Sequence, residues 1–337
     1  MRCRWSAGVG ALSFGLVVAV NPAASAETAA LRIARPVDLV ALPLIVMQHE
    51  HLIERVAEQM GLGAVKIDWI NPGKTAPIDA LSAGQAELAA TDVASFVIAA
   101  DNTVGTPGEV RALAALTERP YVLVARKAGV NTIRDFRAGD HIAVPALKTS
   151  GPALMLEMAA AQEWGIEHYD KLDPLVVARP DEAASEALQS GKGNLDAHFS
   201  QAPYADDELV NAAIHRIMDS FDIAGPHSAA ALVVTARFHD ANPKLCVAIL
   251  SALEQADDTI KSNPGSVAEM YASLTKDQDI AVEDLTDMIG EPDLGYRAAP
   301  SGLMRLTDFM HRVGRLKRQP GSWTELFVPE AHDLPGS

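Results

Sequence analysis

Short apolar runs alternate with amphipathic segments along most of the chain. Runs that alternate with a period of two predict strands, and segments whose apolar residues recur every three to four positions predict helices. The predicted strands are residues 31–34, 65–69, 88–90, 111–116, 121–125, 142–144, 175–178 and 195–199. The predicted helices between them are residues 44–60, 75–83, 93–100, 152–164 and 181–189. Strands and helices in this alternation indicate parallel βαβ units and an α/β fold.

The alternation restarts after Gly129, and two successive sets of units indicate two similar lobes. The C-terminal third is mostly helical. There Asn242 is expected to cap a helix that has Pro243 in its first turn, and another helix is expected around residues 303–316. A chain that builds one lobe, crosses over and returns forms a hinged cleft. We expect residues 27–117 with 235–337 to form lobe one, and residues 118–234 to form lobe two.

The first 26 residues have the three parts of an export signal. Arg2 and Arg4 make a basic start, residues 6–20 carry no charge, and an Ala-Ser-Ala pattern ends at Ala26. The apolar run is too short to span a bilayer comfortably, and no later run suggests a membrane span. We therefore expect cleavage near Ala26 and a mature protein that is free in the periplasm.

The composition limits which partners the protein can bind and which reactions it can catalyse. The formal net charge is −16, which disfavours nucleic acid and anionic membranes as partners. Cys3 falls in the predicted signal, and Cys246 lies in an apolar helical stretch, where a buried, inert thiol is expected. The ten histidines are scattered, without the spacing of a zinc site, and no serine-hydrolase elbow occurs. We expect no metal, no cofactor and no catalytic residue.

Four segments together resemble one family. They are GKTAPIDALSAGQAELAA (73–90), VNTIRDFRAGDHIAVPALKTSGPALMLEMAAAQEWGI (130–166), GNLDAHFSQAPYADDEL (193–209) and GRLKRQPGSWTELF (314–327). In this order, behind an export signal, they are similar to segments of the periplasmic solute-binding proteins of the nitrate/sulfonate/taurine transporter family. The resemblance implies a type II periplasmic-binding-protein fold, with two α/β lobes joined by two crossing strands. It also implies delivery of a small solute to an inner-membrane ABC permease and its ATPase.

Ligands of open α/β sheets lie at the carboxyl ends of the strands, where helix N-termini offer free backbone N–H groups. In lobe two, Thr149, Ser150 and Gly151 fall between a predicted strand and a predicted helix. Either Gly151 caps the helix and the two hydroxyls face the cleft, or Ser150 is itself the cap. In lobe one, Lys74 and Thr75 are the matching candidates, with an exposed turn lysine as the alternative.

Five further residues follow predicted strands or the crossing between lobes. Asp38 and Asp92 each precede a helix, and each is either an N-cap or a contact that would suit an amine and oppose a bare anion. His198 and Ser200 share one face at a strand end, where His198 is either a ligand donor or a buried structural histidine. Arg119 lies at the first expected crossing and either clamps an anion or is a surface arginine.

The sequence favours a small organic anion, a sulfonate or a carboxylate, as the ligand. Nitrate, bicarbonate and neutral pyrimidines stay open, because residues that would mark one substrate are not recognisable. The expected role is that of a monomeric transport receptor that binds and closes without chemistry. Two alternatives are an enzyme on the same fold, which would need a catalytic lysine or a cofactor-bearing cysteine, and a periplasmic partner that presents its ligand to a membrane sensor.

Overall fold

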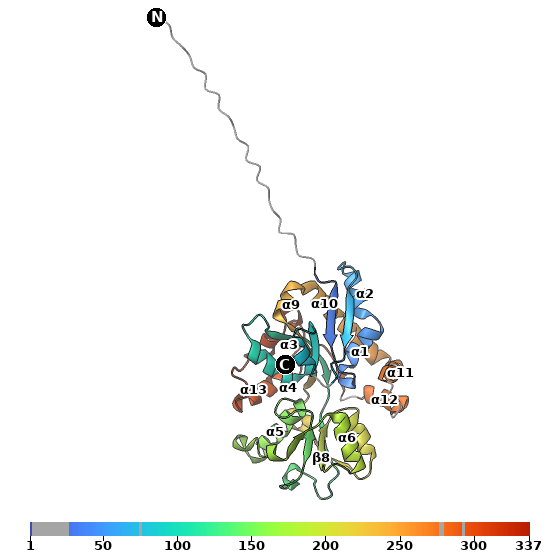
Figure 1. The fold of residues 1–337 in the computed structure, drawn as a ribbon, viewed down its shortest axis with the longest axis vertical. Coiled ribbons are helices and arrows are strands. Elements are labelled where there is room, and N and C mark those ends of the chain that lie inside the picture. The colour runs from blue at the N-terminus through green and yellow to red at the C-terminus, as the bar shows by residue number, and fades with distance from the viewer. Residues whose placement is uncertain (2–26, 74–75, 276–279, 292–293) are drawn as a thin grey trace.

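The computed structural model describes Met1 and residues 27–73, 76–275, 280–291 and 294–337. The described chain forms two lobes, one above the other in Figure 1, and each lobe is built around a mixed β-sheet. Apart from Met1, the predicted export signal lies outside the described residues, and so do Lys74 and Thr75.

The upper lobe has a sheet with the strand order β11-β4-β10-β3-β1-β2. Its strands are β1 (Ala30–Ala34), β2 (Lys66–Ile70), β3 (Leu88–Asp92), β4 (Val110–Glu118), β10 (Ser228–Thr235) and β11 (Gly295–Tyr296). As the alternation predicts, β1 is parallel to both β2 and β3. Its helices are α1 (Leu42–His49), α2 (Leu52–Gln59), α3 (Pro77–Ser82), α4 (Val93–Thr103), α9 (Ala236–Ala241) and α10 (Pro243–Ser262).

The lower lobe has a sheet with the strand order β7-β6-β8-β5-β9. Its strands are β5 (Val122–Ala125), β6 (Ile142–Val144), β7 (Val176–Ala178), β8 (Ala197–Ser200) and β9 (His215–Asp219). Its helices are α5 (Gly151–Trp164), α6 (Asp181–Ser190), α7 (Tyr204–Val210) and α8 (Ser220–Ala224). The parallel pairs are β6 with β7 and β6 with β8, as expected for βαβ units.

Two crossings join the lobes, as the family resemblance implies. The first runs from β4 through residues 119–121 into β5, and the second runs from α8 through residues 225–227 into β10. Because β10 pairs with β3 and β4, residues 228–234 belong to the sheet of the upper lobe. The expected boundary at residue 234 therefore places one strand too many in lobe two, while the rest of the domain division stays a prediction.

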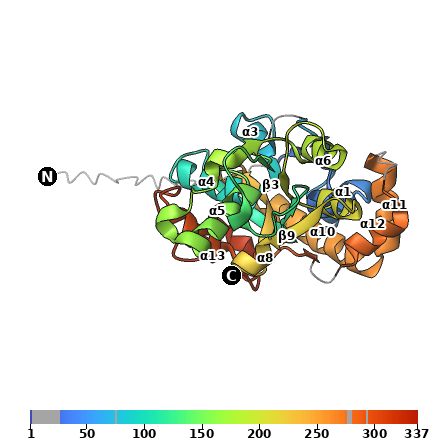
Figure 2. The ribbon, with the colours of Figure 1, turned by 90° about the horizontal axis from the view of Figure 1, so that it is seen from below.

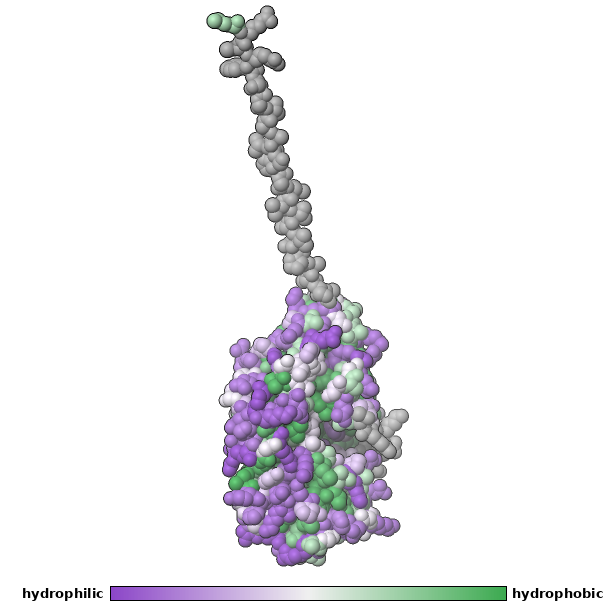
Figure 3. Space-filling model, turned by 60° about the vertical axis from the view of Figure 1, so that its left-hand side comes forward, coloured by the Kyte–Doolittle hydropathy of each residue, from purple (hydrophilic) through white to green (hydrophobic). Residues whose placement is uncertain are grey.

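Helices of the C-terminal third lie on both flanks of the lobe junction. In Figures 1 and 2, α13 (Leu303–Arg312) lies on the side of α5, and α11 (Pro264–Thr275) and α12 (Val282–Ile289) lie on the opposite side with α6. None of the helices in the described part of the chain is both long and apolar enough to cross a membrane. Hydrophilic residues cover most of the face shown in Figure 3.

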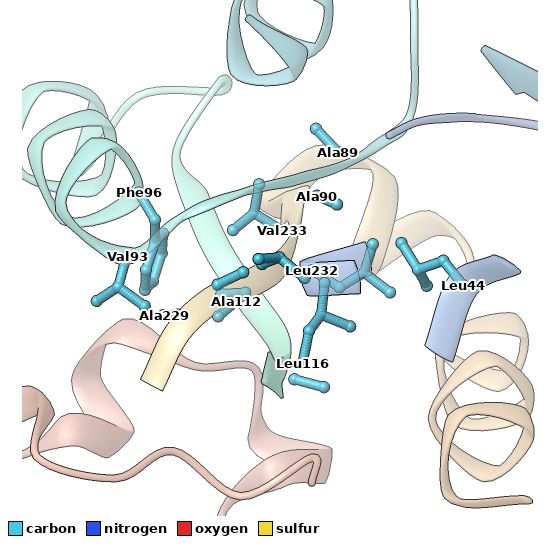
Figure 4. Packing of buried hydrophobic residues seen from close by; sticks show 14 of the residues in the cluster. Leu44, Ala89, Ala90, Val93, Phe96, Ala112, Leu116, Ala229, Leu232 and Val233 are labelled. Atoms are coloured by element: carbon cyan, nitrogen blue, oxygen red, sulfur yellow. The ribbon is translucent and has the colours of Figure 1, made fainter. Parts of the chain in front are cut away.

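The core of the upper lobe consists of small and branched apolar side chains from β3, β4 and β10. Figure 4 shows Leu232 and Val233 of β10 packed between Ala112 of β4 and Ala89 of β3, with Phe96 of α4 on one side. All five are fully buried. The alanines let helices pack close to the sheet, which fixes the strand ends that face the lower lobe.

Two local predictions need correction. The helix predicted over 44–60 is two helices, because the chain turns at His51, whose φ of 51° lies in the left-handed region and breaks the helical path. Asn242 precedes α10 as expected, but its side chain makes no capping bond to the helix. Instead its Oδ1 accepts a hydrogen bond from the Thr28 amide at 2.8 Å and its Nδ2 donates to the Phe238 carbonyl.

Candidate functional site

A cavity of about 170 Å³ lies between the lobes, and we call it the central cavity. Its polar lining residues are Asp38, Thr91, Asp92, Tyr121, Ser150, Asp181 and Gln201. They come from strand ends, helix starts and crossings of both lobes. The volume is below the roughly 300 Å³ at which drug-sized sites begin, so the ligand that fits here is small.

Two carboxylates from the upper lobe line the central cavity, and both also cap helices. Asp38 accepts a hydrogen bond from the Ala41 amide at 3.0 Å and caps a short 3₁₀ turn. Asp92 accepts one from the Ser95 amide at 3.0 Å and is the N-cap of α4. The N-cap alternative is thus confirmed for each aspartate, and because both also line the cavity, a contact with the ligand stays a prediction.

Burial raises the pKa of both aspartates. The pKa of Asp38 rises to about 6, chiefly because of desolvation and also because of the charge on Asp181; the amides of Ala41 and Val40 and the charge on Arg35 act in the opposite direction. Desolvation likewise raises the pKa of Asp92, against hydrogen bonds that include one from the Gly151 amide. A positively charged partner stabilises the ionised form of a buried carboxylate of this kind.

The start of α5 forms the opposite wall. Ser150 is its N-cap, since its Oγ accepts a hydrogen bond from the Ala153 amide at 3.4 Å, so of the two alternatives for the cap it is Ser150 that the structure shows. Gly151 lies against Tyr121, and a Cβ on it would be 2.3 Å from the Tyr121 Oη. Thr149 is exposed, and its carbonyl accepts a hydrogen bond from Ser95 of the upper lobe at 3.1 Å. Ser150 and Gly151 thus line the cavity, and Thr149 lies outside its lining.

His198 and Ser200 lie behind the cavity. Both are fully buried. His198 lies between Glu208, 2.7 Å from its Nδ1, and Asp181, 3.1 Å from its Nε2. Burial alone would lower the pKa of His198, but the hydrogen bonds to the two carboxylates outweigh it and raise the pKa to about 9. The structural alternative thus describes His198: it holds Asp181, which does line the cavity.

Arg119 lies at the first crossing, as predicted, but it does not line the central cavity. It is 6% exposed, and its Nη2 is 2.8 Å from Asp206 and 3.6 Å from Glu291. These carboxylates belong to α7 and to the chain just after α12, so the arginine bridges the two lobes. An anion clamp at Arg119 would have to break this bridge.

Sequence reasoning missed Tyr121, Asp181 and Gln201. Asp181 is the first residue of α6 and follows the end of β7 after two intervening residues, so the strand-end rule that identified Asp38 and Asp92 also applies to it. Tyr121 ends the first crossing, and its Oη donates a hydrogen bond to the Ala229 carbonyl of β10 at 3.2 Å. This hydrogen bond joins segments that are far apart in the sequence, so no pattern along the chain predicts it.

The described residues offer no metal site: no group of three or more His, Cys, Asp or Glu side chains among them could hold an ion. Cys246 is fully buried in α10, as predicted, and burial raises the pKa of its thiol to about 12. A thiol in this state is a poor nucleophile.

Comparison with known structures identifies the fold. The alkanesulfonate-binding protein SsuA from Xanthomonas axonopodis pv. citri, bound to MOPS, superposes with a TM-score of 0.67 at 16% identity, covering 91% of this chain and 99% of that one. The sulphonate-binding SsuA of Escherichia coli gives 0.66 at 16% identity over 90% and 92% of the two chains. The nitrate-binding protein NrtA from Synechocystis PCC 6803 gives 0.67 at 13% identity over 90% and 87%. The shared architecture confirms the predicted periplasmic-binding-protein fold.

Sequence comparison identifies the family. No curated protein matches the chain significantly. The profile of the NMT1-like family matches residues 24–275, which is most of the chain and covers both lobes. The predicted resemblance to the solute-binding proteins of nitrate/sulfonate/taurine transporters is thereby confirmed, and the chain belongs to the NMT1-like family.

Proposed function

We propose that this protein is the periplasmic substrate-binding component of an ABC importer. It captures a small solute in the central cavity, closes its lobes and delivers the solute to an inner-membrane permease driven by an ATPase. The observation that carries the proposal is the cavity itself, because its lining combines strand ends and helix starts from both lobes. A ligand that touches both lobes stabilises the closed state over the open one.

The protein works as a monomeric receptor without chemistry of its own. The lining of the central cavity supports this role, since it holds neither a cysteine nor a described lysine. An enzyme of the same fold would need such a residue for covalent or cofactor chemistry. The sensor alternative uses the same cavity and differs in the membrane partner, so uptake of the ligand by cells with and without the gene separates transport from sensing.

The ligand class predicted from the sequence is an organic anion, a sulfonate or a carboxylate. Binding of sulfonates and of nitrate by proteins of this fold supports that prediction. The three aspartates in the lining argue against a bare anion, whereas a ligand that carries an amino group as well as an acidic group is compatible with both observations.

A thermal-shift screen of the purified protein tests the function. The panel should contain sulfonates, carboxylates, amines, nitrate, bicarbonate and pyrimidines of small size. A ligand at 100 times its Kd adds about 2.7 kcal/mol to the free energy of unfolding, so a true ligand raises the Tm measurably. The bound compound should be recovered unchanged. Turnover of a compound would contradict the receptor role.

A further inference from the structure

We infer that the central cavity selects a small ligand that carries a positive charge, such as a protonated amine. The inference rests on the proposed function and specifies its substrate class. It depends on three features of the described residues: the signs of the charges that line the cavity, the state of the helix N-termini that face it, and the charges along its entrance.

The charged side chains in the described lining all have the same sign. Asp38 and Asp92 come from the upper lobe and Asp181 from the lower lobe, while lysine, arginine and histidine are absent from the described lining. A bare anion placed among three carboxylates is repelled by each of them, and the low dielectric of a closed cleft strengthens the repulsion. A cation between the same carboxylates is attracted from both lobes, so it favours closure.

Carboxylates of the chain itself cap two of the helical segments that start at the cavity, α4 and the short 3₁₀ turn after Asp38. Asp92 accepts a hydrogen bond from the Ser95 amide in the first turn of α4. Asp38 accepts a hydrogen bond from the Ala41 amide and so caps the short 3₁₀ turn. The positive ends of these two segments, which would attract sulfonate or nitrate, are thus neutralised, and both aspartates line the cavity.

Thr91 also lines the central cavity, next to Asp92 in the sequence. A threonine hydroxyl can accept a hydrogen bond from an ammonium group or donate one.

The groove next to the central cavity is lined by charges of the same sign. Asp38 also lines a groove of about 940 Å³ between the lobes, with Glu182, Glu186 and Asp207 of the lower lobe. A neighbouring hollow shares Asp207 and adds Asp206, Asp284, Asp287 and Glu291. We call the two together the acidic groove. Neither part has a basic residue in its described lining, and a path of this kind raises the local concentration of cations.

Three probes of similar size test the inference by isothermal titration calorimetry: butylamine as the cation, butane-1-sulfonate as the anion, and 3-aminopropane-1-sulfonate, which carries both charges. We expect butylamine or the aminosulfonate to bind at least tenfold more tightly than butane-1-sulfonate. Tighter binding of butane-1-sulfonate than of both amines would overturn the inference and leave the proposed function standing. Failure of all three probes, and of the wider panel, would count against the proposed function as well.

Substitution of the aspartates tests which carboxylates bind the positive charge of the ligand. Asparagine caps a helix about as well as aspartate, so Asp38→Asn and Asp92→Asn should keep the fold and remove only the charge. Each should weaken binding of the amine by about 10- to 100-fold, the usual range for a hydrogen bond to a charged group. Asp240→Asn, at a side chain 72% exposed on α9, is the control and should change nothing. Amine binding that is unchanged in both Asp38→Asn and Asp92→Asn overturns the inference.

Discussion

The two flanks of the interlobe cleft differ in how they join the lobes. On one flank α13, which packs on α4, reaches across to α5 and α8, and the groups that meet there have complementary charges. On the other flank α6 and α7 face α11 and α12 across the acidic groove. The difference indicates which side holds the lobes together and which side admits the ligand.

The tied flank depends on buried contacts. Arg315 pairs with Glu157 of α5 and donates a hydrogen bond to the Lys148 carbonyl at 2.6 Å. Phe309 of α13 packs edge-on against Tyr169, with ring centroids 6.3 Å apart. The side chains of Arg315 and Glu157 are only 13% and 4% exposed, so this pair is well shielded from water and salt.

Carboxylates outnumber basic side chains among the described residues of the open flank. Arg119 lies between Asp206 and Glu291, and carboxylates from both lobes surround it along the acidic groove. Like charges that face one another across a gap favour its opening, and a cation that enters removes that repulsion. The comparison therefore predicts that stability depends on the tied flank, whereas affinity and its pH and salt dependence depend on the open one.

The largest effect is expected from breaking the tied flank. Arg315→Met leaves Glu157 buried without its cation, which costs about 3–5 kcal/mol of unfolding free energy. Urea unfolding measures the loss. The matched control is Arg312→Met, whose ion pair with Asp308 is 3.8 Å long and about half exposed, and which should cost less than 1 kcal/mol. Equal effects of the two variants would contradict the assignment of the tied flank.

A smaller loss is expected where the hinge meets the start of α5. Gly151→Ala places a methyl group 2.3 Å from the Tyr121 Oη, so the helix or the ring must move. Overpacking of this kind costs about 1–3 kcal/mol, and here it should also weaken ligand binding. Thermal unfolding and calorimetry measure the two losses. Gly108→Ala, where the nearest heavy atom is 3.9 Å away, should leave both unchanged, and a similar result for Gly151→Ala would show that the cleft tolerates the shift.

The pH dependence of binding tests whether the ligand is a cation held by ionised carboxylates. The pKa of Asp38 is about 6, with Arg35 and Asp181 as its charged neighbours, so the carboxylate is ionised above pH 6 and protonated below it. Because an amine needs the ionised form, its affinity should fall about fivefold between pH 6 and pH 5. Calorimetry at several pH values measures the slope. Asp38→Asn should flatten it, and an affinity that rises as the pH falls would indicate an anionic ligand.

The smallest effect is expected in the association rate. The acidic groove should steer a cation inward, so the rate constant should fall as ionic strength rises. Replacing both Asp284 and Asp287 by asparagine should lower the rate constant about two- to threefold at low salt and weaken its salt dependence. Stopped-flow measurements over a range of salt concentrations test this. A rate constant that rises with salt would contradict steering of a cation.

Much of the fold follows from local pattern. The strand at residues 142–144 and the helix after Ser150 could be predicted, because a short apolar run and a capped segment with apolar residues at helical spacing are local signals. The break at His51 could not, since the residue adopts its left-handed conformation only in the context of two packed helices. The pairing of β10 in the upper lobe likewise depends on contacts far apart in the sequence.

The candidate site was predicted in part for the same reason. Asp38, Asp92, Ser150 and Gly151 line the central cavity because the strand-end rule applies to each. His198 and Arg119 were placed at the correct ends of their strands, but their side chains pair with carboxylates from other elements. Partners of this kind are set by tertiary packing, which no spacing along the chain reveals.

A crystal structure of the protein with the compound that binds most tightly is the most direct test of capture between the lobes. We predict that the ligand lies in the central cavity, touches both lobes and places a positively charged nitrogen within hydrogen-bond distance of Asp38 or Asp92. A ligand bound on the outer surface would contradict capture in the cleft. An anionic group seated against the start of α5, with Asp92 displaced, would contradict the assignment of the charge.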